Sequence, residues 1–271
     1  MKKFSKILVC PKCGENLVAG GNSLVCKNNH CYDIAKEGYV NLLLANMKKT
    51  KMPGDDKLMV QARKTFLDKD YYGKLKTEIN KVILDYQPKI LLDAGCGTGY
   101  YSNNLGDDIE VIGVDISKFA IMSASKNNKN GNYVVASIFD LPLKNESVDA
   151  ILNVFAPKPQ NEFKRVLKPN AIIIEVVPGG QHLKELKQAI FENNYKENAE
   201  KFAFDSFKLL NSRRVQYVEA IKDKNDFTEL LQMTPYWYKG GEKNLNLLNN
   251  ANLEKNHIRF YNQYLGVIYV E

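Results

Sequence analysis

The sequence lacks any apolar run long enough to cross a bilayer, which takes about 20 consecutive residues. Its first residues, MKKFSKILVCPKCG, carry basic side chains, but their apolar run is too short for a secretory signal peptide. We therefore expect a cytoplasmic protein with no membrane partner. With 271 residues, of which 44% are hydrophobic, the chain can bury one large core, or one large and one small core.

Cysteine is almost missing beyond residue 31, since four of the five cysteines precede position 32. In a reducing compartment such crowding favours metal binding over disulfides. Cys10, Cys13, Cys26 and His30 are spaced C-x2-C-x12-C-x3-H, which is typical of a tetrahedral zinc site. Residues 16–26 read as two short strands that carry the second pair of ligands back to the first. We predict a structural zinc ion, because so small a segment needs the metal to fold and four protein ligands leave no open position.

The fourth ligand has a competitor. Cys31 follows His30 directly, and a site of four cysteines would be chemically acceptable. We favour His30. The alternative for the whole group, buried free thiols beside a surface histidine, is disfavoured by four ligands at this spacing.

The net charge is compatible with a polyanionic partner, and a generally lysine-rich composition explains it equally well. The chain has 38 Lys and Arg against 31 Asp and Glu, a net charge of +7 that matters for binding only if it is clustered on one face. Lys48, Lys49 and Lys51, in a segment that joins the zinc module to the rest, are candidates for phosphate contacts. A solvated linker explains them equally well.

A glycine-rich loop follows the zinc module. Residues 89–105, KILLDAGCGTGYYSNNL, read as an apolar strand that ends at Asp93, a turn, and a polar segment that can begin a helix. Gly95, Gly97 and Gly99 let the backbone pass close to a ligand. The next apolar segment, EVIGVDIS, ends in Asp115, at the distance where a carboxylate suits a ribose diol. The two features together indicate a nucleotide-type cofactor.

Strands and helices then alternate at the spacing of a parallel sheet. Residues 132–153 contain a third and a fourth strand, and residues 162–178 an amphipathic helix and a fifth strand. Residues 213–221 and 257–271 supply the last two strands, which we expect to form an antiparallel pair. The predicted fold is α/β, a doubly wound, mostly parallel seven-stranded sheet with a small N-terminal zinc-binding module.

The order D-x-G-C-G-T-G resembles class I S-adenosylmethionine-dependent methyltransferases, whose core is Rossmann-like, more than nicotinamide dehydrogenases. The resemblance implies S-adenosyl-L-methionine as the cofactor. It implies that Asp93 and the glycines face the methionine part and that Asp115 accepts the ribose hydroxyls. It also places Ser137 and Ile138, next to Ala136, at the adenine.

The whole chain resembles the zinc-containing bacterial large-subunit (23S) rRNA (guanine-N1)-methyltransferases, which include relatives that give resistance to macrolides such as tylosin. The zinc spacing and the segments YDIAKEGYVNLL, PGDDKLMVQARKTFLDKDYY, DAGCGTGYY, PGGQHLKELK and LQMTPYWYK carry the match. The resemblance implies that Tyr72, Gly97, Thr98 and His182 lie near the cofactor. It implies an RNA-recognition zinc module, a basic linker and a methyltransferase domain, which we assign to residues 1–45, 46–72 and 73–271.

The reaction that this resemblance implies is methyl transfer from S-adenosylmethionine to N1 of a guanine in a hairpin loop of 23S rRNA. No N/D-P-P-Y/F motif follows the fourth strand, which argues against attack by an exocyclic amino group. Asn153, Phe155 and Pro157 lie there and are the catalytic candidates, although none is an obvious general base. Tyr71 and the run 236–238 are candidates for stacking on the target base, with a place in the core as the alternative.

Two other functions stay open. A small-molecule methyltransferase would keep the same cofactor loop without needing a zinc module. A noncatalytic zinc-dependent RNA-binding protein would not need the intact acidic and glycine residues of the loop. A homodimer is compatible with the sequence, which fixes neither the oligomeric state, nor the guanine, nor the choice between antibiotic resistance and ribosome maturation.

Overall fold

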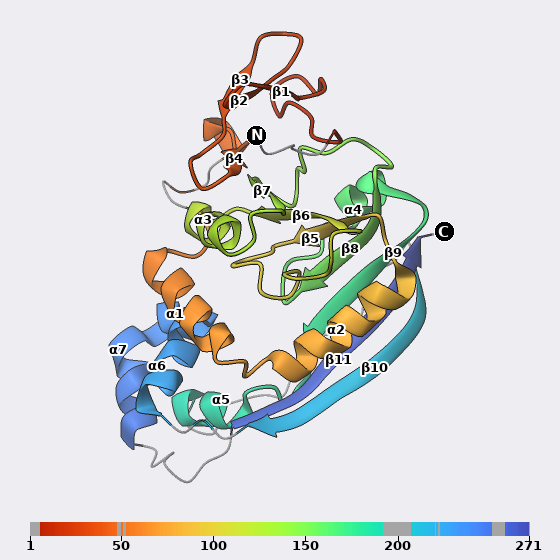
Figure 1. The fold of residues 1–271 in the computed structure, drawn as a ribbon. Coiled ribbons are helices and arrows are strands. Elements are labelled where there is room, and N and C mark those ends of the chain that lie inside the picture. Colours follow the sequence, from red (N-terminus) through yellow and green to blue (C-terminus); the bar gives the residue numbers. More distant parts are fainter. Residues whose placement is uncertain are drawn as a thin grey trace.

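The computed structural model describes most of the chain and contains two β-sheets (Figure 1). The described residues are 6–47, 50, 53–191, 207–219, 221, 223–250 and 258–270. The small sheet is antiparallel and lies at one end of the molecule. Its strands, in spatial order, are β1 (Val18–Gly20), β2 (Ser23–Val25) and β3 (Cys31–Asp33).

The large sheet has eight strands in the order β10-β11-β9-β8-β5-β6-β7-β4. The six strands from β9 to β4 are parallel, and β11 is antiparallel to both β9 and β10. The bounds are β4 (Tyr39–Asn41), β5 (Ile90–Ala94), β6 (Glu110–Asp115), β7 (Asn132–Val135), β8 (Val148–Val154), β9 (Leu167–Pro178), β10 (Phe207–Glu219) and β11 (Ile258–Val270). The predicted fold class is confirmed, and β4 adds an eighth strand to the seven that the sequence indicates.

Helices cover the large sheet and extend beyond it (Figure 1). They are α1 (Lys57–Asp68), α2 (Gly73–Tyr86), α3 (Lys118–Asn127), α4 (Gln160–Val166), α5 (Lys184–Phe191), α6 (Lys224–Gln232) and α7 (Pro235–Asn250), with one 3-10 turn at Ala45–Met47. The Asp56 carboxylate caps α1 by accepting from the Met59 amide at 2.9 Å. Within the described part of the chain, no helix combines the length and the hydrophobicity that a membrane crossing needs.

The parallel strands are buried on both faces, which explains their continuous apolar runs. On β5, Leu91 and Leu92 are fully buried in different clusters. Leu91 packs with Ile79 of α2, whereas Leu92 shares its cluster with Leu24 of the small sheet. The zinc module therefore completes one face of the main core.

The N-terminal segment also enters the sheet itself. Strand β4 pairs in parallel with β7, and the Leu42 amide donates to the Val135 carbonyl at 2.9 Å. This strand lies within the predicted module 1–45, and helix α1 lies within the predicted linker 46–72. The domain boundaries stay predictions, and Lys48, Lys49 and Lys51 lie outside the described residues.

The aromatic ring of Tyr133 packs against Gly113 of β6 and Gly99 of the glycine-rich loop. Tyr133 of β7 is fully buried, and a Cβ added to Gly113 of β6 would lie 2.6 Å from its ring. A Cβ on Gly99 would lie 3.0 Å from the Tyr133 hydroxyl oxygen. Glycine at these two positions thus leaves the space that the ring occupies.

We predict that Gly113→Ala lowers the free energy of unfolding by about 1–3 kcal/mol, because the added methyl group overpacks the Tyr133 ring. Chemical denaturation measures the change. Gly20→Ala is the matched control, since the nearest atom to its added Cβ is a Val25 methyl carbon at 3.7 Å. Equal stability of Gly113→Ala and the wild type would refute this account of the glycine.

Candidate zinc cluster and cofactor pocket

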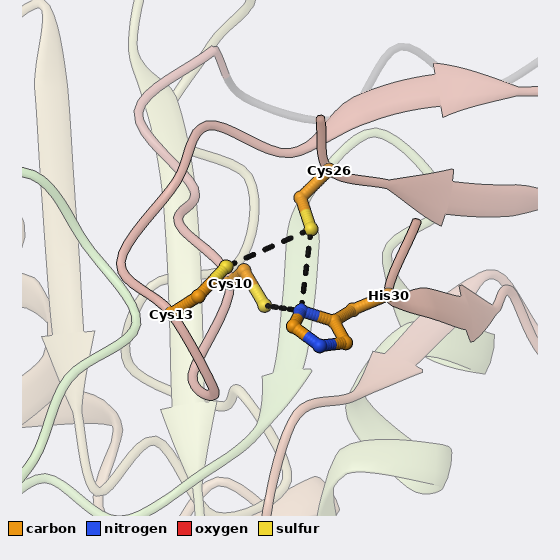
Figure 2. A group of neighbouring side chains, drawn as sticks. All are labelled: Cys10, Cys13, Cys26 and His30. Carbon is orange, nitrogen blue, oxygen red and sulfur yellow. Dashed lines mark hydrogen bonds between the residues drawn. The ribbon is translucent and has the colours of Figure 1, made fainter. Parts of the chain in front are cut away.

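Three cysteines and one histidine converge at the small sheet (Figure 2). Cys10 and Cys13 lie on one tight turn, where the Gly14 amide donates to the Cys10 carbonyl at 2.8 Å. Gly14 takes a φ of 75°, which favours glycine. Cys26 and His30 flank a second turn between β2 and β3, closed by the Cys26 amide and the His30 carbonyl at 3.1 Å.

The spacing of the ligand atoms fits a tetrahedral zinc ion. All four atoms lie within 4.8 Å of one another. The two sulfurs of Cys13 and Cys26 are 3.7 Å apart, and His30 Nδ1 is 3.4 Å from the sulfur of Cys10 and 3.4 Å from that of Cys26. Zn–S bonds of about 2.3 Å place tetrahedral ligands roughly 3.8 Å apart. The structure gathers His30 into the group, as predicted, whereas Cys31 lies exposed on β3.

The surroundings of the thiols differ. A hydrogen bond from the Glu15 backbone lowers the pKa of the Cys13 thiol to about 6, which favours the thiolate that binds zinc. Burial raises the pKa of Cys26. A divalent cation between the four ligands offsets this desolvation, so the donor set fits zinc both in geometry and in charge.

A cavity of about 330 Å³ opens at the carboxyl ends of β5, β6 and β8. Eight of the ten predicted cofactor residues line it: Tyr72, Asp93, Gly95, Gly97, Thr98, Asp115, Ser137 and Ile138. Two of the three catalytic candidates, Phe155 and Pro157, also line it. Loops far apart in the sequence therefore meet at one site, as expected for the edge of a parallel sheet.

The glycine-rich loop and Asp115 are held against each other. The Asp115 carboxylate accepts from the Gly97 amide at 2.9 Å and from the Ser117 amide at 2.8 Å. Gly95 has a φ of 77°, and an added Cβ would lie 2.8 Å from the Ala156 methyl carbon. The loop after β5 thus packs directly on the loop after β8.

Asp93 is the most strongly buried carboxyl group of the cavity. Its side chain accepts from the Ser102 hydroxyl at 2.5 Å and is 3% exposed. Burial raises its pKa to about 7, and the nearby negative charge of Asp115 acts in the same direction, while the Ser102 bond opposes the shift. The cavity thus contains a carboxyl group that titrates near neutral pH.

Three predicted residues lie outside the lining of the cavity. Gly99 continues the turn, with a φ of 75°, and packs on the Tyr133 hydroxyl. His182 is buried behind the wall, where its Nε2 lies 3.3 Å from the Tyr72 hydroxyl and its ring stacks on Phe155. Burial lowers the pKa of His182 to about 3, so the imidazole is neutral at physiological pH.

Asn153, the third catalytic candidate, is buried at the end of β8 and does not line the cavity. Its amide nitrogen donates to the Pro157 carbonyl at 3.0 Å. Phe155, between them, adopts a left-handed φ of 53°, a conformation that costs energy and persists where the surroundings impose it. Asn153 therefore fixes the shape of the loop that forms one wall of the cavity.

Sequence reasoning missed an arginine at the cavity. Arg63 of α1 donates through Nε to Asp55 at 3.0 Å and through Nη2 to the Met233 carbonyl at 2.8 Å. Arg63, Asp55 and Met233 all line the cavity. Arg63 and Asp55 both lie in the segment PGDDKLMVQARK. The sequence signal for them is a glycine and a helix N-cap residue, followed by an arginine on the same helix.

The strap of residues 53–56 closes the cavity beside Asp115 and Ile116. The Ser117 hydroxyl donates to the Asp55 carbonyl at 2.6 Å. Gly54 has a φ of 79°, and an added Cβ would lie 2.9 Å from atoms of both Ile116 and Ser117. The strap thus packs directly on the turn that follows Asp115.

The candidates for base stacking lie against the core. Tyr71 stacks on Phe66 with ring centroids 4.6 Å apart and donates to Asp226 at 2.5 Å. Tyr236 and Trp237 are partly buried against the same cluster. The side chain of Tyr238 lies outside the described residues. These contacts favour the core alternative.

Comparison with known proteins assigns both parts of the chain. A zinc-ribbon family model described as "RlmA, N-terminal" matches residues 8–51, and one described as "Methyltransferase domain" matches residues 88–234. The 23S rRNA (guanine(748)-N(1))-methyltransferase of Streptomyces fradiae is 33% identical over 70% of this chain and 69% of its own length. The chain belongs to the RlmA-type 23S rRNA (guanine-N1)-methyltransferase family.

A second relative spans nearly the whole chain. The Bacillus subtilis protein YxjB, whose name carries a provisional 23S rRNA (guanine-N1) methyltransferase assignment, is 30% identical over 88% of this chain and 89% of its own. The crystal structure of the YcgJ protein, also from Bacillus subtilis, superposes with a TM-score of 0.50 at 17% identity, over 74% of this chain and 99% of YcgJ. That likeness concerns the fold. Family membership makes the protein an S-adenosylmethionine-dependent methyltransferase with a zinc ribbon.

For the zinc cluster, we predict that Cys31→Ser keeps one zinc ion per chain, whereas Cys26→Ser loses it. Cys26 belongs to the group of four ligands, and Cys31 is exposed and outside it. Elemental analysis of the purified variants measures the metal. Loss of zinc from Cys31→Ser would overturn the choice of His30 as the fourth ligand.

Proposed function

We propose that this protein transfers a methyl group from S-adenosylmethionine to N1 of a guanine in a hairpin loop of 23S rRNA. The observation that carries the proposal is one chain with both a zinc ribbon and a glycine-rich cavity of its family's methyltransferase type. The relative from Streptomyces fradiae that is 33% identical to this chain is named for this chemistry. A small-molecule methyltransferase would not need the zinc ribbon.

The lining of the cavity suggests how the donor is held. We assign Asp93, Gly95 and Thr98 to the methionine part of the donor, because they surround the end of β5. Asp115 would accept the ribose hydroxyls, a role that suits a carboxylate already oriented by two backbone amides. Ser137 and Ile138, on the loop after β7, would border the adenine.

Tyr72 forms part of the cavity wall, and His182 lies behind it. Tyr72 lines the cavity, and the neutral imidazole of His182 holds its hydroxyl. His182 has no lining position of its own. We therefore assign it the task of orienting Tyr72 and Phe155 rather than that of a proton relay.

The bound donor supplies an activated methyl group on a sulfonium. The protein then has to align that methyl group with guanine N1 in a dry pocket. N1 carries a proton at neutral pH, which has to pass to solvent as the N–C bond forms and the S–C bond of the donor breaks. The base must also leave the stack before it can enter a cavity. Asn153, Phe155 and Pro157 have no side-chain group that is basic at neutral pH. We assign them the shaping of the target-base pocket.

A cytoplasmic location and a contribution to macrolide resistance stay predictions, as does a homodimer. The first follows from the proposed substrate, because ribosomal RNA is a cytoplasmic partner in bacteria. The second depends on which guanine is modified, and the third on the behaviour of the protein in solution.

The proposed reaction predicts a new block to reverse transcription in 23S rRNA. N1 methylation removes the guanine's pairing edge, so primer extension should stop next to one guanine in RNA treated with the enzyme and S-adenosylmethionine. The matched control is Asp115→Ala, which loses the proposed ribose ligand and should give a weaker stop at limiting donor concentration. Absence of any stop with wild-type enzyme, on RNA from cells lacking the gene, would refute the assignment.

Asp93 predicts a pH dependence of donor binding. Its raised pKa of about 7 leaves it neutral below that pH and negative above it, so attraction for the cationic donor grows as the pH rises. Linkage of one proton with a pKa of about 7 allows roughly a tenfold loss of affinity from pH 8 to pH 6. Titration calorimetry with S-adenosylmethionine measures it. Asp93→Asn should bind more weakly with a flatter profile, and an unchanged slope in this variant would exclude Asp93 as the titrating group.

A further inference from the structure

One short loop lies between the zinc module and the cofactor cavity. We call residues 136–144, which follow β7, the bridging loop. Its first part faces the cavity through Ser137, Ile138 and Phe139. Its last part pairs with the chain just before the first zinc ligand. The Val9 amide donates to the Pro142 carbonyl at 2.9 Å, and the Lys144 amide donates to the Ile7 carbonyl at 2.9 Å.

The N-terminal segment holds this loop at both ends. At the start, β4 pairs with β7, and the Leu42 amide donates to Val135, the residue before the loop. At the other end, Leu8 and Leu143 form an antiparallel bridge, and both side chains are fully buried. Cys10 belongs to the same apolar cluster as these two leucines. A zinc ligand is thus two residues from the bridge.

Arg165 of α4 holds the loop from its other side. Its guanidinium donates to the carbonyls of Leu141 at 2.8 Å and Leu143 at 2.7 Å, and to the Asn145 side chain at 2.9 Å. Glu162 fixes the guanidinium through two hydrogen bonds, of 3.0 Å and 2.6 Å, and accepts from the Leu141 amide at 2.6 Å. Arg165 lines no part of the cofactor cavity and is not one of the zinc ligands.

The bridging loop is therefore held by the N-terminal segment and by Arg165, and it lines part of the cavity. Zinc binding supplies much of the folding free energy of so small a module, so the N-terminal support depends on the metal. We propose that the bridging loop couples the two sites, with zinc in the ribbon raising the affinity for the donor and Arg165 acting as a positioning residue for the adenine side of the cavity. The proposal rests on the proposed function, since it requires donor binding beside Ser137 and Ile138.

Coupling of this kind is reciprocal: if zinc raises donor affinity by some factor, the donor raises zinc affinity by the same factor. The two affinity measurements therefore check each other. Hydrogen exchange and the Arg165 variant test whether the bridging loop carries the coupling.

The first experiment compares the zinc-loaded full chain with the same protein after chelation. S-adenosylhomocysteine is the probe, and calorimetry measures its affinity. We expect zinc removal to weaken binding about tenfold, within the usual range of coupling between sites. Saturating S-adenosylhomocysteine should stabilise zinc by the same factor in competition with a chromogenic chelator. Hydrogen exchange should rise in residues 136–144 and stay unchanged in β8.

The second experiment uses Arg165→Met. Although Arg165 touches neither site, its loss should weaken S-adenosylhomocysteine binding by about fivefold or more and also lower the affinity for zinc. Arg165→Lys, which keeps the charge and one donor group, should recover part of both. The matched control is Arg213→Met. Arg213 lies on β10, where it pairs with the carboxylate of Glu78 and donates to the Glu78 carbonyl. It should change neither affinity.

Three results would overturn the coupling: equal affinity for S-adenosylhomocysteine with and without zinc, an Arg165→Met variant with both affinities intact, or loss of exchange protection in β8 together with the loop. The last would mean general unfolding. Failure of the zinc-loaded wild type to bind S-adenosylhomocysteine would instead contradict the proposed function, and so the two failures are distinguishable.

Discussion

The parallel pairing of β5 with β6 and β8 is the constraint on which the site depends. In this register Asp93 lies opposite Gly113 on one side and Leu152 on the other, so all three strands end at one edge. Parallel strands need long crossovers, and the chain leaves the sheet at this edge after each of the three strands: into a series of turns after β5, and into loops that lead to α3 after β6 and to α4 after β8. The three departing loops become the walls of the cavity. The chemistry of the cavity is set by the residues at the carboxyl ends of these three strands.

The carboxyl ends of β5 and β6 bring two buried carboxyl groups, Asp93 and Asp115, into one cavity. Burial raises the pKa of Asp93 and of Asp115, and the latter carboxylate is stabilised by two backbone amides that oppose the shift. Arg63 reduces the unfavourable charge further, because its guanidinium lies at the same cavity and lowers the pKa of Asp115. A cationic ligand is attracted to such a site. Without a cation, burial of the two carboxylates destabilises their charged forms. The strap and Arg63 are therefore part of the electrostatics of the site as well as of its shape.

Local patterns predicted the parts of the molecule that are determined locally. The cysteine spacing indicated the four ligands, and the glycine-rich turn with Asp115 indicated most of the cavity lining. Contacts between segments that are distant in the chain could not be predicted from the sequence. Arg63 reaches a carbonyl 170 residues away, and β4 is only three residues long and becomes a strand by pairing with β7. His182 was expected at the cofactor, but only tertiary packing decides that it stands behind Tyr72.

The position of the zinc module follows from its size. Its three strands have three residues each, and Val18 is 63% exposed, so little apolar surface is available within the small sheet itself. A segment of this kind gains stability from a metal and from a neighbouring core. Leu8 and Leu24 provide the second contribution by entering the cluster that contains Leu92 of β5. Those leucines alternate along the chain with the zinc-binding turns, so a bound metal and the sheet would both order the same short segment.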